Sequence, residues 1–439
     1  MSRLLVAQRA LTVPGWAKNA LWRSARAIPS LDLRFADDKS LTDAVTGASL
    51  ITFTRASSGT YVGSDGVLRT AAIDAPRFDH NPTTGESLGL LVEDARTNSL
   101  RNNTMVGAVA GTPGTVPTNW GDVPTSNGLN RQIVGIGTQN GITYIDIRYS
   151  GTTTATSTTV TQPEPSSATV AANGQAWTAS SWLALVGGST SGLTVIQRVT
   201  GRSSVGGFLE NTDTTVALSS TLTRYVASIT MANASTLRVS SDIVLSYSSG
   251  AAIDITLRIG LPQLEQGAKE SSVITTTSAT ATRSADVASI TGTAFTSFYN
   301  QSEGTVFSAF SIPTSSTTGG ARVYSLSNSS ATTQAWLRLQ GGTNRLYEVT
   351  DSSTQQAVLS AGTFSAGVLY RGAVALKTND FGFSENGSTP TVDNSGTLGT
   401  VDRMGIGMDS SGSAPLNGHI RRLTYWPQAL PSRLQALTQ

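Results

Sequence analysis

The sequence contains no cysteine and only two histidines, His80 and His419. The lack of cysteine excludes disulfides and thiolate metal sites, so stability has to come from core burial or from oligomerisation. Nucleophilic catalysis by a serine or a cysteine normally needs a histidine as its base. His80 lies in a turn-rich segment and His419 in a distant β-rich region, so we predict neither as a catalytic residue.

Charge is scarce as well, since charged residues make up 13% of the 439 residues and the net charge is +2. A chain with this balance has no electrostatic footprint for nucleic acid. No stretch approaches the roughly 18 consecutive apolar residues that a membrane-spanning helix needs, so we expect no membrane insertion. The sequence shows no motif for a metal or a cofactor, and we predict neither.

The basic residues concentrate near the N-terminus. Of residues 1–30, the first 27 have some features of a signal peptide, but Arg9, Lys18, Arg23 and Arg26 interrupt any hydrophobic region. We interpret these residues as an arm that docks on a partner surface, and a mobile tail is the alternative. The residues expected to make this contact are Trp16, Trp22, Arg23 and Arg26.

What the chain has in abundance is β-strand signal. Its apolar residues alternate with polar ones between turns rich in Gly, Ser and Asn, which is the pattern of half-buried strands. Ile255, Leu257 and Ile259, separated by Thr256 and Arg258, are a clear example. The length of 439 residues indicates two or three domains. We therefore expect an all-β fold with few helices.

The strand pattern divides the chain into modules. Residues 31–103 are predicted to form a β-rich attachment module with hairpin turns at Gly59 and Gly66. Residues 104–271 hold about seven alternating strands, the pattern of a sandwich or jelly roll. Within them, residues 151–170 fit an edge strand and loop, because proline is tolerated at a sheet edge.

Trp177 and Trp182 lie an odd number of residues apart in one predicted strand. Unless a bulge intervenes, one ring should face the core and the other should face outward. The apolar content falls further along, and residues 272–289 are predicted as a linker. Residues 290–439 form a second β-rich unit, and the spacing of leucines in residues 431–439 is compatible with one or two helical turns.

Several separated motifs occur in a fixed order: FTRASSGTYV, LGLLVEDARTNSL, and LPQLEQG followed by TRSAD. Together they resemble a module of tailed-phage fibre and spike proteins. This resemblance implies that Ala95–Asn98 leads into a jelly-roll domain similar to carbohydrate-binding modules, and that Gln263–Gly267 closes it.

The C-terminal unit carries EGTVF, WLRL, FSENG and the closing strand GHIRRLTYWPQAL. In this order they resemble a concanavalin-A-like, laminin-G-like lectin sandwich. The fold expected for the whole chain is an N-terminal arm, a jelly-roll sandwich and then a second, concanavalin-A-like β-sandwich.

An enzyme that cleaves glycosidic bonds needs two carboxyl groups about 5 to 9.5 Å apart. Glu93 and Asp94 are adjacent, so on a strand they would face opposite sides. Sequence spacing does not place Glu303, Glu348 and Glu385 relative to one another. We therefore predict no catalytic residue and no enzymatic activity, and a polysaccharide depolymerase is the alternative.

Sugar binding requires aromatic platforms, because a sugar ring presents an apolar face that stacks on Trp or Tyr while its hydroxyls take polar partners. The carbohydrate-binding candidates in the lectin-like unit are Trp336, Tyr347 and Tyr370. The alternative, which should apply to most of them, is that these rings are core aromatics of the sandwich.

The resemblance implies a structural virion protein of a tailed bacteriophage, a tail-fibre or head-spike subunit on the particle surface. Its expected partners are other virion proteins through the N-terminal arm, host-surface polysaccharide, and further copies of itself, since homotrimers are usual in such fibres. A capsid decoration protein without a receptor role is a further alternative.

Overall fold

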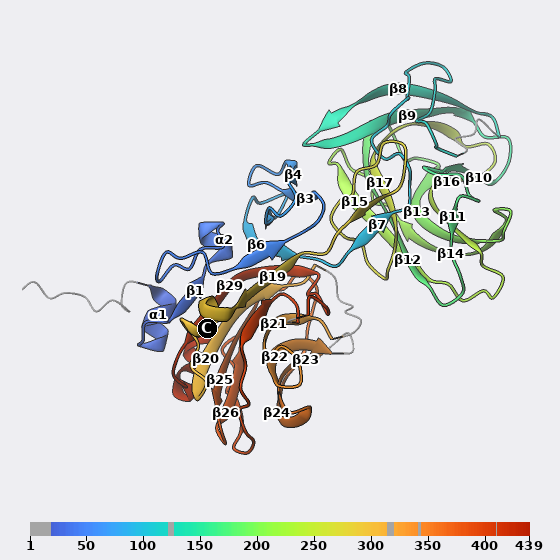
Figure 1. The fold of residues 1–439 in the computed structure, drawn as a ribbon. Helices are drawn as coiled ribbons and strands as arrows, with labels where there is room; N and C mark the ends of the chain where they lie inside the picture. Colours follow the sequence, from blue (N-terminus) through green and yellow to red (C-terminus); the bar gives the residue numbers. More distant parts are fainter. Residues whose placement is uncertain (1–18, 122–126, 314–319, 341–343, 410) are drawn as a thin grey trace, which may run out of the picture. The chain divides into compact units, whose positions relative to one another are not determined.

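The computed structural model describes residues 19–439 except 122–126, 314–319, 341–343 and 410. Most of the regular structure is β-strand, which confirms the predicted fold class (Figure 1). The described helices are short, and none of them is long and apolar enough to cross a membrane. They are α1 (Ala20–Ala25), α2 (Phe35–Asp38), α3 (Gly292–Thr296), the 3-10 helix η2 (Pro431–Arg433) and α4 (Leu434–Thr438), of which the last two confirm the predicted C-terminal turns.

The chain folds into two compact units that are both discontinuous in sequence. Unit 1 comprises the described part of Met1–Phe53 together with Ser87–Val92 and Val287–Gln439, and unit 2 comprises Thr54–Glu86 and Glu93–Asp286. The predicted attachment module, residues 31–103, is therefore divided between the two units rather than forming one of its own.

Unit 1 contains two antiparallel sheets, as expected for the lectin-like sandwich. The strands of the first sheet that belong to unit 1 have the order β27-β26-β25-β20-β29-β6, and β1 also pairs with β29. The second has the order β2-β19-β28-β21-β22-β23-β24. The first sheet is built from β1 (Leu31–Leu33), β6 (Ser87–Val92), β20 (Glu303–Ser311), β25 (Tyr370–Lys377), β26 (Phe381–Glu385), β27 (Thr391–Asp393) and β29 (Gly418–Trp426). The second is built from β2 (Thr52–Thr54), β19 (Val287–Thr291), β21 (Arg322–Ser327), β22 (Gln334–Gln340), β23 (Asn344–Asp351), β24 (Thr354–Thr363) and β28 (Arg403–Ile406).

Two strands from the N-terminal part of the chain complete the first sheet. Leu31 lies opposite Tyr425 across β1 and β29, and Leu90 lies opposite Ile420 across β6 and β29. Leu31, Leu90, Ile420 and Tyr425 are fully buried. β29 lies more than three hundred residues after β1 and β6 in the sequence, so local pattern cannot reveal this pairing.

The helix α1 belongs to unit 1 as well. Asn19 caps it by accepting a hydrogen bond from the Leu21 amide at 3.0 Å, and Ala25 is buried against Trp426 and Leu434. The described end of the predicted arm, from Asn19 to residue 30, is therefore part of a folded domain rather than a separate extension.

Unit 2 is built around a jelly roll of two five-stranded sheets. One has the order β10-β16-β13-β14 with β11 also on β16, and the other has the order β15-β12-β17-β9-β8. β10 lies at a sheet edge, as predicted for residues 151–170. The strands are β8 (Leu129–Gln139), β9 (Ile142–Thr152), β10 (Ser157–Thr161), β11 (Thr169–Val170), β12 (Ala176–Gly188), β13 (Leu193–Arg202), β14 (Phe208–Thr215), β15 (Thr223–Thr230), β16 (Arg238–Tyr247) and β17 (Ala252–Gln266).

Much of the predicted linker, residues 272–289, is fixed to unit 2. The Asn98 and Asn103 side-chain amides both donate to the carbonyl oxygen of Ile274, each at 3.0 Å. The Ile274 amide donates to Gln263 Oε1 at 2.8 Å. Hydrogen bonds from buried polar side chains thus hold this segment in place of apolar contacts. Because the segment has few apolar residues, its composition alone indicates a flexible tether.

The same segment continues as a strand. β18 (Ala281–Arg283) pairs antiparallel with β7 (Arg96–Asn98), and β19 begins at Val287. The motif around Asn98 and the motif around Gln263 are therefore structural ties that hold residues 271–286 against the jelly roll.

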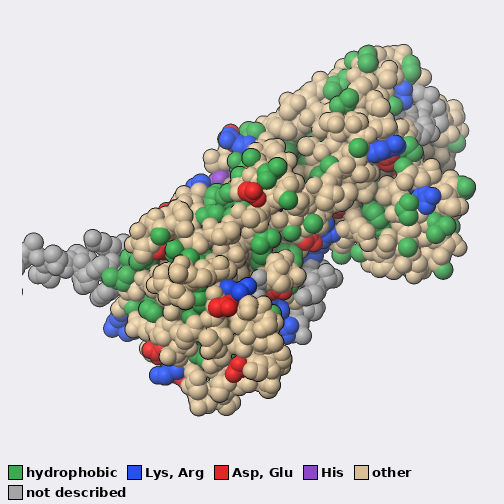
Figure 2. Space-filling view, viewed as in Figure 1, with side chains coloured by type: hydrophobic (Ala, Val, Ile, Leu, Met, Phe, Trp, Pro, Cys, Tyr) green, Lys and Arg blue, Asp and Glu red, His purple; other side chains and the backbone are tan. Residues whose placement is uncertain are grey.

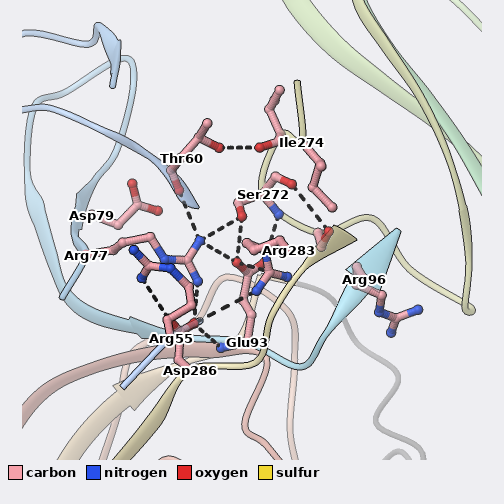
Figure 3. A network of polar contacts seen from close by, with 12 residues as sticks. Arg55, Thr60, Arg77, Asp79, Glu93, Arg96, Ser272, Ile274, Arg283 and Asp286 are labelled. Atoms are coloured by element: carbon pink, nitrogen blue, oxygen red, sulfur yellow. Dashed lines mark hydrogen bonds and ion pairs between the residues drawn. The ribbon is translucent and has the colours of Figure 1, made fainter. Parts of the chain in front are cut away.

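A buried network of arginines and carboxylates joins the parts of unit 2 (Figure 3). Arg77 Nη1 donates to Glu93 Oε2 at 2.7 Å and to Ser272 Oγ at 2.7 Å, and Arg77 Nη2 pairs with Asp286. Arg55 Nη1 donates to Asp286 Oδ1 at 3.0 Å. Arg283 completes the network 3.4 Å from Glu93, and the three arginine side chains are at most 1% exposed.

Two β-hairpin strands depend on this network. β3 (Gly59–Val62) and β4 (Leu68–Ala71) pair only with each other among the described strands. Arg77 donates to the Thr60 carbonyl at 3.0 Å, and the Thr60 hydroxyl donates to the Val273 carbonyl. Because a two-stranded hairpin is marginally stable by itself, these directional bonds fix its position.

The network also sets the titration of Glu93. Burial would by itself raise the pKa of this carboxyl, but Arg283 and Arg77 together with hydrogen bonds from Ser272 hold the pKa well below its usual range. Its stabilising effect is therefore complete above the unfolded-state pKa of about 4.3 and is lost as the pH falls below that value.

We expect Glu93→Gln to lower the free energy of unfolding of unit 2 by about 3 to 5 kcal/mol at pH 7, because it leaves buried guanidinium groups without their counter-charge. The difference from wild type should shrink as the pH falls below about 4. Denaturant unfolding at a series of pH values measures both effects. Asp254→Asn, which removes the exposed ion pair with Arg148, is the matched control and should change little. Equal losses in the two variants at pH 7 would contradict the assigned role.

Candidate functional site

A cavity of about 430 Å³ lies in unit 2, between the jelly roll and the β3–β4 hairpin. Its walls come from the hairpin, the β8–β9 turn, β12 and the loop before β15. The residues lining it are Val62, Gly66, Leu68, Pro82, Thr83, Gln139, Asn140, Ile142, Trp182, Ser220, Thr221, Leu222, Thr223 and Arg224. This size and this mixture of apolar and polar groups are typical of small-ligand sites.

Trp182 provides the aromatic surface of the cavity. Trp177 packs in the interior cluster with Val199 and Leu264, whereas Trp182 packs with Ile142 in a separate cluster. The register slips between Ser180 and Trp182, but the extra residue is in β17, so β12 keeps its alternation. The two tryptophans therefore face opposite sides of the sheet, as predicted.

The indole N–H of Trp182 is buried and has no hydrogen-bond partner within the described structure. A buried donor without a partner is unfavourable by about 1 to 3 kcal/mol. Because the indole N–H is enclosed by protein, the ring contributes apolar surface to the cavity.

Uncharged polar groups surround this ring. Ser220, Thr221 and Thr223 contribute hydroxyls, and Asn140 lies on the turn opposite them. Arg224 is held in place, since its Nη1 donates to the Ser271 carbonyl at 2.8 Å and its Nη2 to Ser180 Oγ at 2.9 Å. None of the described lining residues is a carboxylate. The arrangement suits a hydroxyl-rich ligand with one apolar face.

The β8–β9 turn closes one wall of the cavity. Asn140 and Gly141 both have positive φ, of 50° and 78°, as a type I′ hairpin turn requires. The Asn140 carbonyl accepts a hydrogen bond from the Leu68 amide at 2.9 Å, which joins the turn to the hairpin. A Cβ at position 141 would lie 2.2 Å from the Leu68 carbonyl oxygen, so only glycine allows this approach.

The three rings predicted as sugar platforms are buried in unit 1. Trp336 is 7% exposed, Tyr347 is fully buried and Tyr370 is 6% exposed. Tyr347 lies 6.5 Å from Phe383 and Tyr370 lies 5.8 Å from Phe310, measured between ring centroids. These positions correct the expectation of exposed platforms, because a ring enclosed on both faces offers none for stacking. The alternative interpretation, core aromatics, describes Tyr347 and Tyr370, whereas Trp336 lies on the other face of its sheet, beneath Arg322.

The predicted contact residues of the arm have different environments. Trp16 lies outside the described residues. Trp22 is half-buried, and its indole N–H donates to Asp32 Oδ2 at 3.0 Å, so it stabilises unit 1 instead of projecting from it. Arg23 and Arg26 are exposed.

The carboxylates considered for catalysis are held by separate basic residues. Glu303 lies 3.6 Å from Lys377, Glu348 lies 2.6 Å from Arg338, and Glu385 is buried in an ion pair with Arg345. Glu93 belongs to the buried network and Asp94 pairs with Arg96. Within the described ranges, no group of three or more His, Asp or Glu side chains is placed to hold a metal ion.

Charged side chains on the face drawn in Figure 2 lie in small, separate groups, several of which place Lys or Arg beside Asp or Glu. His80 is buried rather than at the surface, as a turn-rich segment would suggest, and its Nδ1 lies 3.0 Å from the Val62 carbonyl oxygen. Trp182 is not among the carbohydrate-binding residues predicted from the sequence. Its odd spacing from Trp177 was the available signal, because that spacing places one of the two rings outside the core.

The sequence matches no protein-family model and no curated protein at a significant level. Solved structures that it resembles include a CBM40 module of a Ruminococcus gnavus sialidase bound to α2,3-sialyllactose, at 15% identity over 32% of this chain and 84% of that chain, with a TM-score of 0.28. Domain 4 of a Geobacillus stearothermophilus arabinanase in complex with arabinotriose gives 16% identity, 35% and 73% coverage, and a TM-score of 0.26. Mouse laminin α1 domains LG4-5 share 10% sequence identity over 58% of this chain and 81% of that chain, with a TM-score of 0.21. Because the sequence identities and TM-scores are this low, these similarities do not indicate which ligand the chain binds or which activity it has.

We expect Gly141→Ala to destabilise unit 2 more than Gly174→Ala does. Both glycines have positive φ, but a Cβ at position 174 would meet no atom within 4 Å, so only the backbone penalty of about 1 to 2 kcal/mol applies there. At position 141 the displaced Leu68 carbonyl adds a further loss and opens the cavity wall. Denaturant unfolding of the two variants gives the difference, and equal values would show that the turn does not hold the wall.

Proposed function

We propose that this protein is a fibre or spike subunit of a tailed-bacteriophage virion that binds host-surface glycans without cleaving them. The observation that supports it most is the cavity at Trp182, where an aromatic residue and several hydroxyl-bearing residues line one space. The ordered motifs that resemble phage fibre and spike modules support the virion setting.

The physical basis of the proposal is stacking combined with hydrogen bonding. A pyranose ring would place its apolar face on Trp182 while its hydroxyls bond to groups such as Thr221 and Asn140. Such a contact is individually weak, and several copies of the subunit on one particle would act together through avidity. A homotrimer is the proposed assembly.

A depolymerase is the less favoured alternative. Glycosidic cleavage uses a pair of carboxyl groups flanking the scissile bond. The described lining of the cavity carries none, and the acidic residues considered above each pair with a basic side chain. The proposal is therefore binding without turnover.

Binding is tested with Trp182→Ala on an array of bacterial capsule and O-antigen oligosaccharides. We expect the affinity of the wild-type ligand to fall about tenfold or more, equivalent to about 1.4 kcal/mol or more, because the stacking surface is lost. Phe208→Ala is the matched control, since Phe208 is 59% exposed on β14 of the other sheet. Reducing ends released by the wild-type protein, or equal binding by both variants, would overturn the proposal.

The virion setting is tested by expressing the double variant Arg23→Ala with Arg26→Ala during phage growth and counting its copies in purified particles by mass spectrometry. We expect fewer copies than for wild type, because both side chains are exposed at the start of unit 1. Lys377→Ala, at an exposed basic residue elsewhere in the unit, should leave the number unchanged. Absence of the wild-type protein from particles would overturn the virion assignment.

A further inference from the structure

A buried carboxylate of unit 2, Glu265, is linked to the cavity at Trp182 by a short chain of hydrogen bonds. Glu265 lies near the end of β17 and is fully buried. Its Oε1 accepts from the Ser271 amide at 2.9 Å, and its Oε2 accepts from the Ser271 hydroxyl at 2.7 Å. The Gln263 side-chain amide also donates to Oε1, at 2.8 Å. Ser271 is thus held through its backbone and its side chain at once.

The chain of bonds continues from Ser271 to the cavity wall. The Ser271 carbonyl accepts from Arg224 Nη1 at 2.8 Å, and Arg224 lines the cavity. Arg224 lies directly opposite Trp182 across β15 and β12, so the two side chains share one face of the sheet. Ser180 Oγ accepts from Arg224 Nη2 at 2.9 Å. The position of Arg224 beside Trp182 therefore depends on where Glu265 holds Ser271.

The next serine is held in the same way by a different carboxylate (Figure 3). Ser272 donates its amide to Glu93 Oε1 at 2.8 Å and its hydroxyl to Glu93 Oε2 at 2.7 Å. Glu93 keeps its charge down to a low pH, because its pKa lies well below the usual range. Its bonds fix the backbone at Ser272 in mildly acidic solution, so a change at Glu265 stays local to Ser271.

The two carboxylates titrate in opposite directions. Burial raises the pKa of Glu265 above its ordinary value, although the Ser271 amide and the charge of Arg224 favour the ionised form. Arg96 is a further positive charge that interacts with this carboxyl. Glu265 therefore becomes neutral at a pH at which Glu93 is still ionised. Its contribution to stability is present at low pH and is lost as the pH rises through the folded-state pKa, so its protonation does not unfold the unit.

We propose that Glu265 is a positioning residue for the Trp182 cavity, and that its protonation releases Arg224 and weakens saccharide binding in mildly acidic solution. Neutral Glu265 carries a proton on one oxygen and loses the ionic character of its bonds to Ser271. The Ser271 hydroxyl then has the Ser272 carbonyl, 3.3 Å away, as an alternative acceptor. The inference rests on the proposed function for the saccharide alone, since the link from Glu265 to the cavity needs no ligand.

The link is tested without a ligand, by fluorine NMR of the full-length protein labelled with fluorotryptophan. Trp182→Phe identifies the Trp182 resonance. We expect this resonance to shift with pH, with a midpoint above the ordinary glutamate value of about 4.3. Glu265→Gln, which is uncharged at every pH, should remove the midpoint. Arg224→Gln should remove it too, because the effect of Glu265 passes through that guanidinium group.

Glu210→Gln is the matched control. Glu210 also accepts hydrogen bonds from two backbone amides, those of Ala232 and Asn233, but it lies on β14 of the other sheet and its pKa is lowered. His80→Gln is a second control, because His80 lies against the Val62 carbonyl at the cavity and an imidazole can change charge in the same pH range. Both variants should keep the wild-type midpoint.

Binding to the array of capsule and O-antigen oligosaccharides is then measured at about pH 7 and about pH 5. We expect the wild-type affinity to fall about fivefold or more at the lower pH, the effect of about one lost hydrogen bond. Glu265→Gln should bind weakly at both. Circular dichroism establishes that each variant is folded, and Arg224→Gln decides the NMR test if Glu265→Gln does not fold.

A Trp182 midpoint that persists in Glu265→Gln or in Arg224→Gln overturns the inference, as does equal wild-type affinity at the two pH values. Binding by no variant and by no wild-type sample at either pH would overturn the proposed function instead. In that case the fluorine titration alone still decides whether Glu265 positions Arg224.

Discussion

The buried pairing of Arg77 with Glu93 and Asp286 is the interaction on which much of unit 2 depends. The segment Thr54–Glu86 contains a short two-stranded hairpin, β3–β4, which is marginally stable by itself. Ionic hydrogen bonds are directional. Here they hold that segment against Glu93 and against Asp286, which lies in the predicted linker. Two of these residues, Glu93 and Asp286, are terminal residues of the unit's second segment.

The candidate glycan cavity follows from that constraint. One of its walls is the jelly-roll face with Trp182, and the other is the hairpin that the network holds. The hydrogen bond from the Leu68 amide to the Asn140 carbonyl is a second tie between the same two parts. The cavity is therefore a product of tertiary restraint, because neither wall encloses it without the other.

The sequence was informative where structure depends on local alternation. The strands of the jelly roll, the edge position of residues 151–170, the opposite orientation of Trp177 and Trp182 and the C-terminal helical turns all follow from spacing that neighbouring residues share. Alternation gives the two faces of a strand but not which other sheet covers them. For that reason Trp336, Tyr347 and Tyr370 were offered as platforms although packing buries them.

Long-range pairing was the part that the sequence could not reveal. Nothing near Leu31 or Leu90 indicates that β29 is their partner, and the buried arginines are indistinguishable from surface ones until Glu93 and Asp286 are brought together. The predicted linker, residues 272–289, is rich in Thr and Ser and therefore has the composition of a flexible tether. Its order comes from amide side chains, such as those of Asn98 and Asn103, that lie well over a hundred residues away in sequence.

The division of each unit into separate segments has a consequence for biosynthesis. All of unit 2 has been translated once Asp286 leaves the ribosome, so the jelly roll can close while the rest is still being made. β1 must wait, because its partner β29 is near the end of the chain. This apolar strand has no partner through most of translation, so the first sheet of unit 1 is completed only when the last strand has been made.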